Sequence, residues 1–370
     1  MNQEELTTFN VGENLDSLMN LDPRGYGVCR ILYNAAREYT KEPLTMNSAK
    51  KLVETLKEGD LVYIMTGFVL RPFKKAETDG IISSMLLARA LVKGFKVKPV
   101  IICQEENMEA VKNLAYVVGL HFHDTIEGLD EYPLSLAGIP FTKDFSKAEA
   151  QADEIISKGL PSAVISIECP GANSKGVYHN SVGIEITHLE AKADILFKKL
   201  KEKGVLNIAI GDLGNELGMA AIKEHLNEYI PYAGKGRCCC GCNGGIAVEV
   251  AADNIITATV SDWGGYGLIA ALAYLKKDIN IMHTPKMEEE ALITASRSGM
   301  IDMYGDLIPA IDGCSLEMIT SIVNLMRETV KSALALTKTC ETWFDKVLEL
   351  GFFENEDNES YEDIGAKKII

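Results

Sequence analysis

The chain has 370 residues, of which 47% are hydrophobic and 24% are charged, and its formal net charge is −16. This composition excludes a globally disordered chain and is sufficient for a large core, in two lobes or in one large domain with additions. The negative charge disfavours nucleic acid and anionic membranes as partners. It does not exclude an anionic substrate, because a metal ion or a few cationic side chains reverse the potential inside a cleft.

Export signals and common cofactor motifs are missing from the sequence. The first residues lack the basic start and apolar stretch of a signal peptide, and the apolar segment around residues 267–275 is too short to span a bilayer. Nine cysteines without a secretory signal indicate a reducing compartment, so a cytoplasmic location is predicted. There is no phosphate-binding P-loop, and residues 211–218 do not follow the dinucleotide-binding glycine spacing. We expect no nicotinamide, flavin or haem.

Apolar patterns predict helices at both ends of the chain and alternating strands and helices between them. Helical spacing over residues 13–57 predicts an N-terminal helical cap. Continuous apolar runs then predict strands that are buried on both faces. The predicted strands are 61–65, 97–103, 163–167, 206–210 and 255–260. Two helices, near 106–118 and 145–159, follow the second of them, and helices near 187–203, 215–229 and 264–276 follow the third, fourth and fifth. A further helix, with apolar residues from Ile82 to Leu91, follows the first strand.

The last third is again helical, near 286–298 and 315–351, and ends in an acidic tail. Alternation of strand and helix indicates βαβ units. The predicted fold class is therefore α/β, with a mostly parallel sheet covered by helices on both faces and with N- and C-terminal helical additions. We divide the chain into an N-terminal helical cap (1–58), an α/β catalytic core (59–313) and a C-terminal helix with the acidic tail (314–370), in one structural unit.

Four predicted strands are each followed by a carboxylate flanked by glycine. These segments are 66–68 with 77–80, 168–171, 211–218 and 261–266. Ligands of open parallel sheets bind beyond the carboxyl ends of the strands, so we expect Glu77, Asp79, Glu168, Asp212, Asn215 and Glu216 to converge on one cleft. Carboxylates gathered in a cleft need a cation or a shared proton. Oxygen ligands without His or Cys favour Mg²⁺, Mn²⁺ or Ca²⁺.

Each motif also has a plain structural interpretation. Asp212 or Glu216 can cap a helix that begins near Asn215, and Asp262 can cap the helix that runs from Gly264. Asp79 before Gly80 is ordinary turn chemistry. Lys74, Lys75, Arg71 and Lys175 can hold a substrate carboxylate or phosphate, or can be ordinary solvated loop charges.

The cysteine-rich run Cys238, Cys239, Cys240 and Cys242 is predicted not to be a zinc site. Four sulfurs within five residues do not easily surround one ion, and no second cysteine pair follows at zinc-ribbon spacing. The histidines His121, His123, His179, His188 and His283 are scattered, and each is interpreted as a surface or core residue rather than a ligand.

Five ordered motifs carry a resemblance to a known family. They are 66–68, 77–80, 167–171 with 176–180, 210–219 and 261–266. Together they resemble the D-glutamate cyclase-like, C-terminal domain family over about Leu61 to Gly313. The chain departs from the usual family residues at Ile81, Cys169, Leu213 and Asp262, where the family usually has proline, arginine, glycine and asparagine.

The resemblance implies a hydro-lyase that converts D-glutamate, or a related small acid, to 5-oxo-D-proline with loss of water. Two alternatives stay open: a metal-dependent hydrolase of a small phosphorylated or carboxylated metabolite, and a non-catalytic metabolite-binding protein. The expected partner is a small acidic metabolite, and the chain is compatible with a homo-oligomer. The candidate residues are, for catalysis, Glu77, Asp79 and Glu216; for a divalent metal, Glu168, Asp212, Asn215 and Glu216; and for substrate, Thr66, Gly67, Arg71, Gly80, Asn173, Lys175, Gly211, Gly214, Ser261, Asp262 and Gly264.

Overall fold

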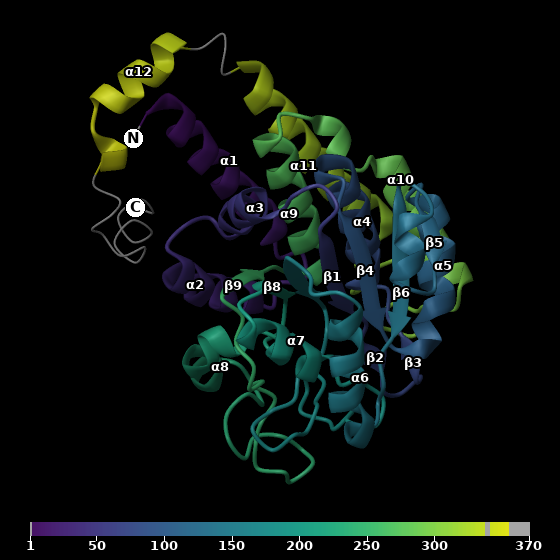
Figure 1. Ribbon diagram of the computed structural model, residues 1–370. Coiled ribbons are helices and arrows are strands. Elements are labelled where there is room, and N and C mark those ends of the chain that lie inside the picture. Colours follow the sequence, from purple (N-terminus) through teal and green to yellow (C-terminus); the bar gives the residue numbers. More distant parts are fainter. Residues whose placement is uncertain (1, 337–340, 355–370) are drawn as a thin grey trace.

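The computed structural model describes residues 2–336 and 341–354. At its centre is a sheet of seven parallel strands in the order β5-β6-β4-β1-β7-β8-β9 (Figure 1). The separate hairpin of β2 (Val69–Leu70) and β3 (Lys75–Ala76) is antiparallel. The strands of the main sheet are β1 (Leu61–Thr66), β4 (Lys98–Cys103), β5 (His121–His123), β6 (Ser135–Pro140), β7 (Ala163–Ile167), β8 (Leu206–Gly211) and β9 (Asn254–Thr257).

The sequence predicted the strands with continuous apolar character and missed two others. The first four predicted strands correspond to β1, β4, β7 and β8 within one residue, and the fifth ends earlier than predicted, at Thr257. The missed strand β6 reads Ser-Leu-Ala-Gly-Ile-Pro, so its sequence has no unbroken apolar run, yet residues 135–138 are buried. The other, β5, has only three residues and lies at the edge of the sheet. Such strands are specified by their neighbours rather than by their own residues.

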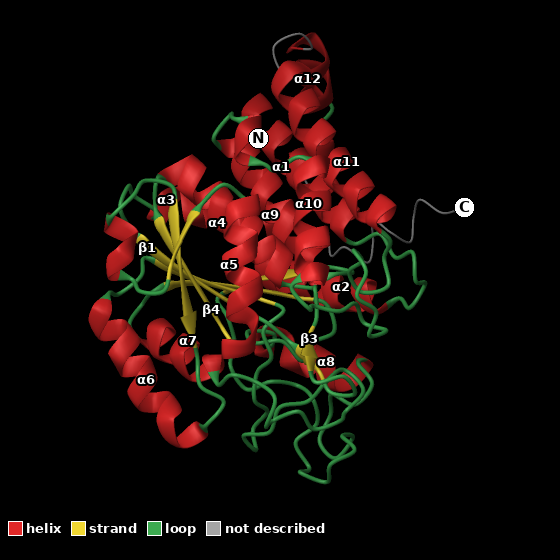
Figure 2. Ribbon diagram, turned by 90° about the vertical axis from the view of Figure 1, so that its right-hand side faces the viewer, coloured by secondary structure: helices red, strands yellow, loops and turns green. Residues whose placement is uncertain are grey.

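Helices cover both faces of the sheet, which confirms the predicted fold class (Figure 2). Around α9 the helices are tightly packed: α3 and α4 contact it directly, and α1 and α11 pack on it from outside. The helices of this face are α1 (Gln3–Met19), α3 (Leu44–Thr55), α4 (Ile81–Phe95), α5 (Met108–Val117), α9 (Ser261–Leu275), α10 (Pro285–Arg297) and α11 (Leu316–Leu336). On the other face α6 (Phe145–Lys158) packs on α7 (Ala193–Glu202). Near the edge strand β9, α2 (Val28–Thr40) contacts both β9 and α8 (Lys223–Tyr229).

Several helix boundaries differ from the predicted ones. The helix predicted over 187–203 begins only at Ala193, and that predicted over 215–229 is regular only over Lys223–Tyr229. The helix predicted from residue 264 begins at Ser261. Within the helix predicted over 315–351, the described residues form α11 and α12 (Glu341–Glu349), and the acidic tail after Glu354 lies outside the described residues.

The strand order reverses direction next to β1. From β1 the chain passes to β4 and then to β5 and β6 on one side, and it returns to place β7 on the other side of β1. The strands point toward the bottom of Figure 1, where the long loops 168–192 and 230–253 lie. In open α/β sheets the crevice for a ligand is at the carboxyl ends of the strands, where the strand order reverses. The region between the ends of β1 and β7 is therefore the expected ligand site.

No helix in the described part of the chain combines the length and apolar character that crossing a membrane requires.

Candidate active site

The carboxylates predicted from the strand ends form one buried group. Glu77 and Asp79 follow β1, Glu168 follows β7, and Asp212 and Glu216 follow β8. Their exposed fractions lie between 0% and 7%. Charged side chains are rarely buried without a partner, so this concentration of acids is a feature that a bound group or shared protons must explain.

Asp212 is the centre of this group. Asp212 belongs to two acidic triads. Carboxylate oxygens of Asp212, Glu168 and Glu216 form the first, those of Asp212, Asp79 and Asp312 form the second, and within each triad the oxygens lie within 4.8 Å of one another. Two overlapping sets of three oxygen ligands are compatible with one or two hard divalent cations.

Among the predicted metal ligands, two oxygen atoms have no hydrogen-bond partner in the described part of the chain. They are Oδ2 of Asp212 and Oδ1 of Asn215, and both are fully buried. The Asn215 amide nitrogen donates to the carbonyl of His179 at 3.2 Å, which fixes the side chain. Buried acceptors without a donor are costly. Both are oxygen atoms of the kind that bind Mg²⁺, Mn²⁺ or Ca²⁺, so the residues present fit a hard cation.

Burial also makes these acids hard to ionise. It raises the pKa of Asp79 to about 8, with Asp312 as the next cause. Burial, then Asp312, raises the pKa of Glu77 well above its usual range. Burial, then the charge of Glu216, raises the pKa of Glu168, and burial, then the charge of Glu168, raises the pKa of Asp212. Without a cation, the group therefore retains protons at neutral pH.

Asp79 lies just before α4 and Asp262 lies in the first turn of α9, and each accepts hydrogen bonds from the start of the other helix. The Asp79 carboxylate accepts hydrogen bonds from the backbone amides of Ser261 (3.2 Å) and Asp262 (2.8 Å), at the start of α9. Asp262 Oδ1 accepts from Gly80 (3.0 Å) and Ser83 (2.9 Å), at the start of α4. The prediction that Asp262 caps its own helix is therefore wrong, because N-cap position 260 is a valine and Asp262 lies inside the first turn.

This reciprocal capping predicts different stabilities for two variants of Asp262. Asp262→Asn keeps an acceptor oxygen for Gly80 and Ser83, so its free energy of unfolding should stay close to that of the parent. Asp262→Ala removes the acceptor of the Ser83 amide and one of the two acceptors of the Gly80 amide, and should lose about 1 kcal/mol. Urea denaturation of both variants checks this, and equal stability of the two would contradict the capping role.

Glu216 does not begin a helix, contrary to prediction. The first helical turn after β8 starts at Ala220, and Glu216 lies in the preceding turn. Its carboxylate instead accepts hydrogen bonds from the amides of Leu213 (2.9 Å) and Gly214 (2.8 Å). These two amides, rather than the start of a helix, hold the Glu216 carboxylate in place beside Asp212.

Two of the predicted glycines are required by close approach. A Cβ on Gly211 would lie 2.6 Å from Oε2 of Glu216, and a Cβ on Gly80, whose φ is +83°, would lie 2.5 Å from Cβ of Glu168. Gly264 has another role: a Cβ there would meet Ile210 of β8, so this glycine serves helix–sheet packing. Gly67 lies against Gln104, to which its carbonyl is hydrogen-bonded.

The other predicted substrate residues divide into two sets. Ser261 is buried beside the acids and donates to Glu168 at 2.6 Å, and Thr66 is buried with its hydroxyl unpaired. Arg71 and Lys175 are exposed. The side-chain amide of Asn173 donates hydrogen bonds to Cys242 Sγ and to the carbonyl of Gly245, both in the loop 230–253.

Two residues of the site were not predicted. Asp312 belongs to one of the acidic triads, and Arg24 donates to it at 2.6 Å. Arg24 comes from the turn between α1 and α2, within the predicted N-terminal helical cap. Asp312 and Glu168 both have positive φ, at 54° and 42°. Such backbone strain in a residue other than glycine is concentrated at functional sites, but a single sequence does not show it.

The comparison with known proteins now decides the family. The family described as D-glutamate cyclase-like, C-terminal, matches residues 15–327. The chain belongs to this family. It is also 28% identical over 270 residues to the human protein D-glutamate cyclase, mitochondrial. That alignment covers 70% of this chain and 38% of the human protein. The chain thus corresponds to well under half of that relative's length.

Proposed function

We propose that this D-glutamate cyclase-like protein converts D-glutamate, or a related small acid, to 5-oxo-D-proline with loss of water. The observation that carries the proposal is the buried group of carboxylates at the strand ends, in a chain of this family. In the reaction the substrate amine bonds to its distal carboxyl carbon, a C–O bond breaks, and water leaves. The site must therefore take a proton from the amine and return one to the departing oxygen.

Glu77 is the residue best suited to move this proton. Among the described residues none donates a hydrogen bond to its carboxylate, whereas Asp79 and Glu216 are tied to backbone amides. Its raised pKa, caused by burial and by Asp312, makes it a stronger base than an ordinary glutamate. The role we propose for Asp79 is positional, because its carboxylate holds the start of α9.

The divalent cation is part of the proposal. Glu168, Asp212 and Glu216 would hold it, with the unpaired amide oxygen of Asn215 as a further ligand. When bound, a hard divalent cation polarises a substrate carboxylate and stabilises the developing oxyanion. An anionic substrate also requires the negative charge of the site to be reduced, and the buried acids achieve this by retaining protons or by ligation. Arg24, paired with Asp312, adds a positive charge at the same edge.

The direct test is product analysis. Purified protein with Mg²⁺, Mn²⁺ or Ca²⁺ is incubated with D-glutamate and, as a control, with L-glutamate, and 5-oxoproline is measured by chiral chromatography. Formation of the D product supports the proposal. Phosphate released from small phosphorylated metabolites would instead establish a hydrolase. Tight binding of a metabolite without turnover would establish a binding protein.

The buried acids also predict how stability depends on pH. A carboxyl group whose pKa is raised on folding binds its proton more tightly in the folded state, so stability falls as pH rises from the unfolded to the folded pKa. For Asp79 this window runs from 3.8 to about 8, and the pKa values of Asp16 and Glu190, raised by burial to about 6 and about 8, act in the same direction.

We therefore expect the melting temperature of chelated protein to fall between pH 5 and pH 8, within the window given by Asp79. A divalent cation replaces the bound protons, so its stabilising effect should be larger at the upper end of this window. Thermal denaturation at several pH values, with and without chelator, measures both effects. A melting temperature that rises through the window without metal would contradict the raised pKa values.

A further inference from the structure

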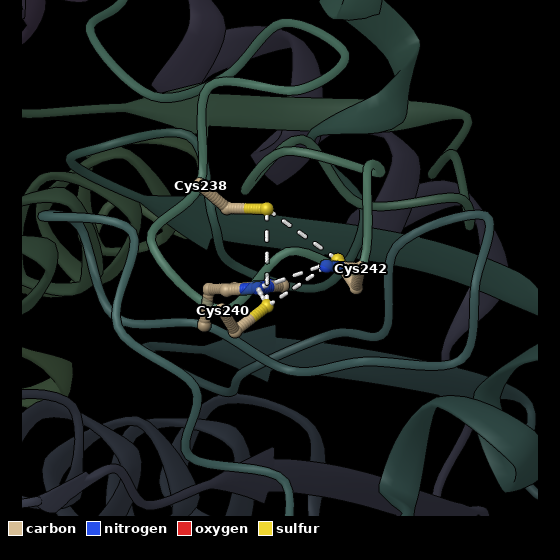
Figure 3. A group of neighbouring side chains, drawn as sticks. Cys238, Cys240 and Cys242 are labelled. Atoms are coloured by element: carbon tan, nitrogen blue, oxygen red, sulfur yellow. Dashed lines mark hydrogen bonds between the residues drawn. The ribbon is translucent and has the colours of Figure 1, made fainter.

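A second cluster of possible metal ligands lies in the loops below the sheet. Three thiols, those of Cys238, Cys240 and Cys242, point toward one another (Figure 3). The imidazole of His179 from the neighbouring loop completes the group, with all four ligand atoms within 4.8 Å of one another. We call these four residues the thiol–imidazole cluster. The sequence analysis predicts no zinc site because it considers the cysteine run alone. His179, the fourth possible ligand, lies 61 residues before Cys240.

The spacing of the cluster fits one tetrahedral zinc ion. With Zn–S bonds of about 2.3 Å and a Zn–N bond of about 2.0 Å, tetrahedral geometry places sulfurs about 3.8 Å apart and sulfur and nitrogen about 3.5 Å apart. Cys238 Sγ lies 3.4 Å from Cys242 Sγ and 3.8 Å from Cys240 Sγ. Nε2 of His179 lies 3.1 Å from Cys240 Sγ and 3.7 Å from Cys242 Sγ. Four ligands at these separations surround a space of the size of a single ion.

Two hydrogen-bond donors would stabilise a thiolate in the cluster. The amide of Gly244 and the side-chain amide of Asn173 donate to Cys242 Sγ, at 3.3 and 3.4 Å. Zinc binds thiolate sulfur and neutral imidazole nitrogen.

Side chains along the cysteine run alternate in direction, so that three of the four thiols face the cluster and one does not. Residues 238, 240 and 242 face the cluster, whereas the Cys239 thiol is exposed and approaches the carbonyl of Val182 at 3.6 Å. The run lies within residues 231–253, a described segment that contains no helix or strand. A long irregular loop of this kind needs something other than a ladder of backbone hydrogen bonds to hold it.

We propose that His179, Cys238, Cys240 and Cys242 bind one structural Zn²⁺. The ion would fasten the loop 230–253 to the loop 168–192. It would also support the acidic site, because Asn215 donates to the carbonyl of His179. The proposal does not depend on the cyclase activity, since its four ligands belong to neither acidic triad.

Metal analysis of the full chain tests the proposal. The protein is purified without a metal-chelating column under reducing conditions, and zinc is measured by mass spectrometry. We expect about one zinc per chain in the parent and in Cys239→Ser, which removes the one thiol of the run that lies outside the thiol–imidazole cluster. Cys240→Ser and His179→Ala should lose most of the zinc. Replacing zinc by Co²⁺ should give the visible absorption of tetrahedral thiolate coordination in the parent and in Cys239→Ser.

Thiol reactivity of the parent protein provides a second test, which does not require any variant to fold. In the parent protein, Cys238, Cys240 and Cys242 should react slowly with a maleimide until a strong chelator is added, while Cys239 reacts at once. Less than a tenth of a zinc per chain would overturn the proposal. So would a disulfide between Cys238 and Cys242 in the reduced preparation, bound iron in place of zinc, or a zinc content that falls equally in Cys239→Ser.

Discussion

Asp212→Asn is expected to abolish turnover and the stabilisation of the protein by divalent cations, while leaving the fold intact. Asp212 belongs to both acidic triads, so its loss weakens every cation position that the triads provide. Asparagine has nearly the same shape, but its neutral amide is a poorer ligand for a hard cation. Because burial and Glu168 raise the pKa of Asp212, the neutral variant should unfold at the same or a higher temperature than the metal-free parent.

Thermal shift with Mg²⁺, Mn²⁺ and Ca²⁺ measures the first effect, and the product assay measures the second. The matched control is Asp16→Asn, which changes a buried carboxylate that belongs to neither triad. Asp16 accepts hydrogen bonds from the amides of Leu44 (2.6 Å) and Thr45 (3.1 Å), so this variant should be less stable yet keep its response to metal. A metal response that persists in Asp212→Asn would remove Asp212 from the proposed cation site.

Glu77→Gln should reduce the turnover number by about 10²- to 10⁴-fold, the usual contribution of general acid–base catalysis. Glutamine preserves the shape of the side chain but does not accept the amine proton. Since Glu77 belongs to neither triad, cation binding should persist, which distinguishes its role from that of Asp212.

Glu77→Asp provides a graded comparison, because it keeps the acid and shortens its reach. We expect activity between that of the parent and that of Glu77→Gln, with an altered pH profile. Rates measured across the pH range with saturating D-glutamate would show this order. Unchanged turnover in Glu77→Gln would assign proton transfer to another group.

The sequence indicated the positions of the carboxylates well because strand ends are simple to locate. An unbroken apolar run followed by glycine and an acid, as at Ile210 and Asp212, specifies both the strand and the residue beyond it. The roles of individual acids were harder to assign. The amides that hold Glu216 belong to a tight turn, and the partners of Asp79 lie at the start of a distant helix.

The two unpredicted residues of the site were missed for a related reason. Arg24 and Asp312 are separated by 288 residues and follow no predicted strand, so no periodic pattern connects them to the acidic group. The same holds for His179, which has no local motif that relates it to the cysteine run. Contacts of this kind depend on the packing of whole elements, and spacing along one sequence does not encode them.

The exchange of caps between α4 and α9 has a consequence for how the protein folds. The hydrogen bonds that the Gly80 amide donates to Asp262 and the Asp262 amide donates to Asp79 join positions 182 and 183 residues apart. Closing so long a segment has an entropic cost before the contact is made, and contacts of high sequence separation slow folding. During synthesis the first turn of α4 emerges long before its capping acid has been translated. The reciprocal caps between α4 and α9 therefore form late, after most of the strands have been translated. Nascent chains that stop before residue 262 should lack these caps.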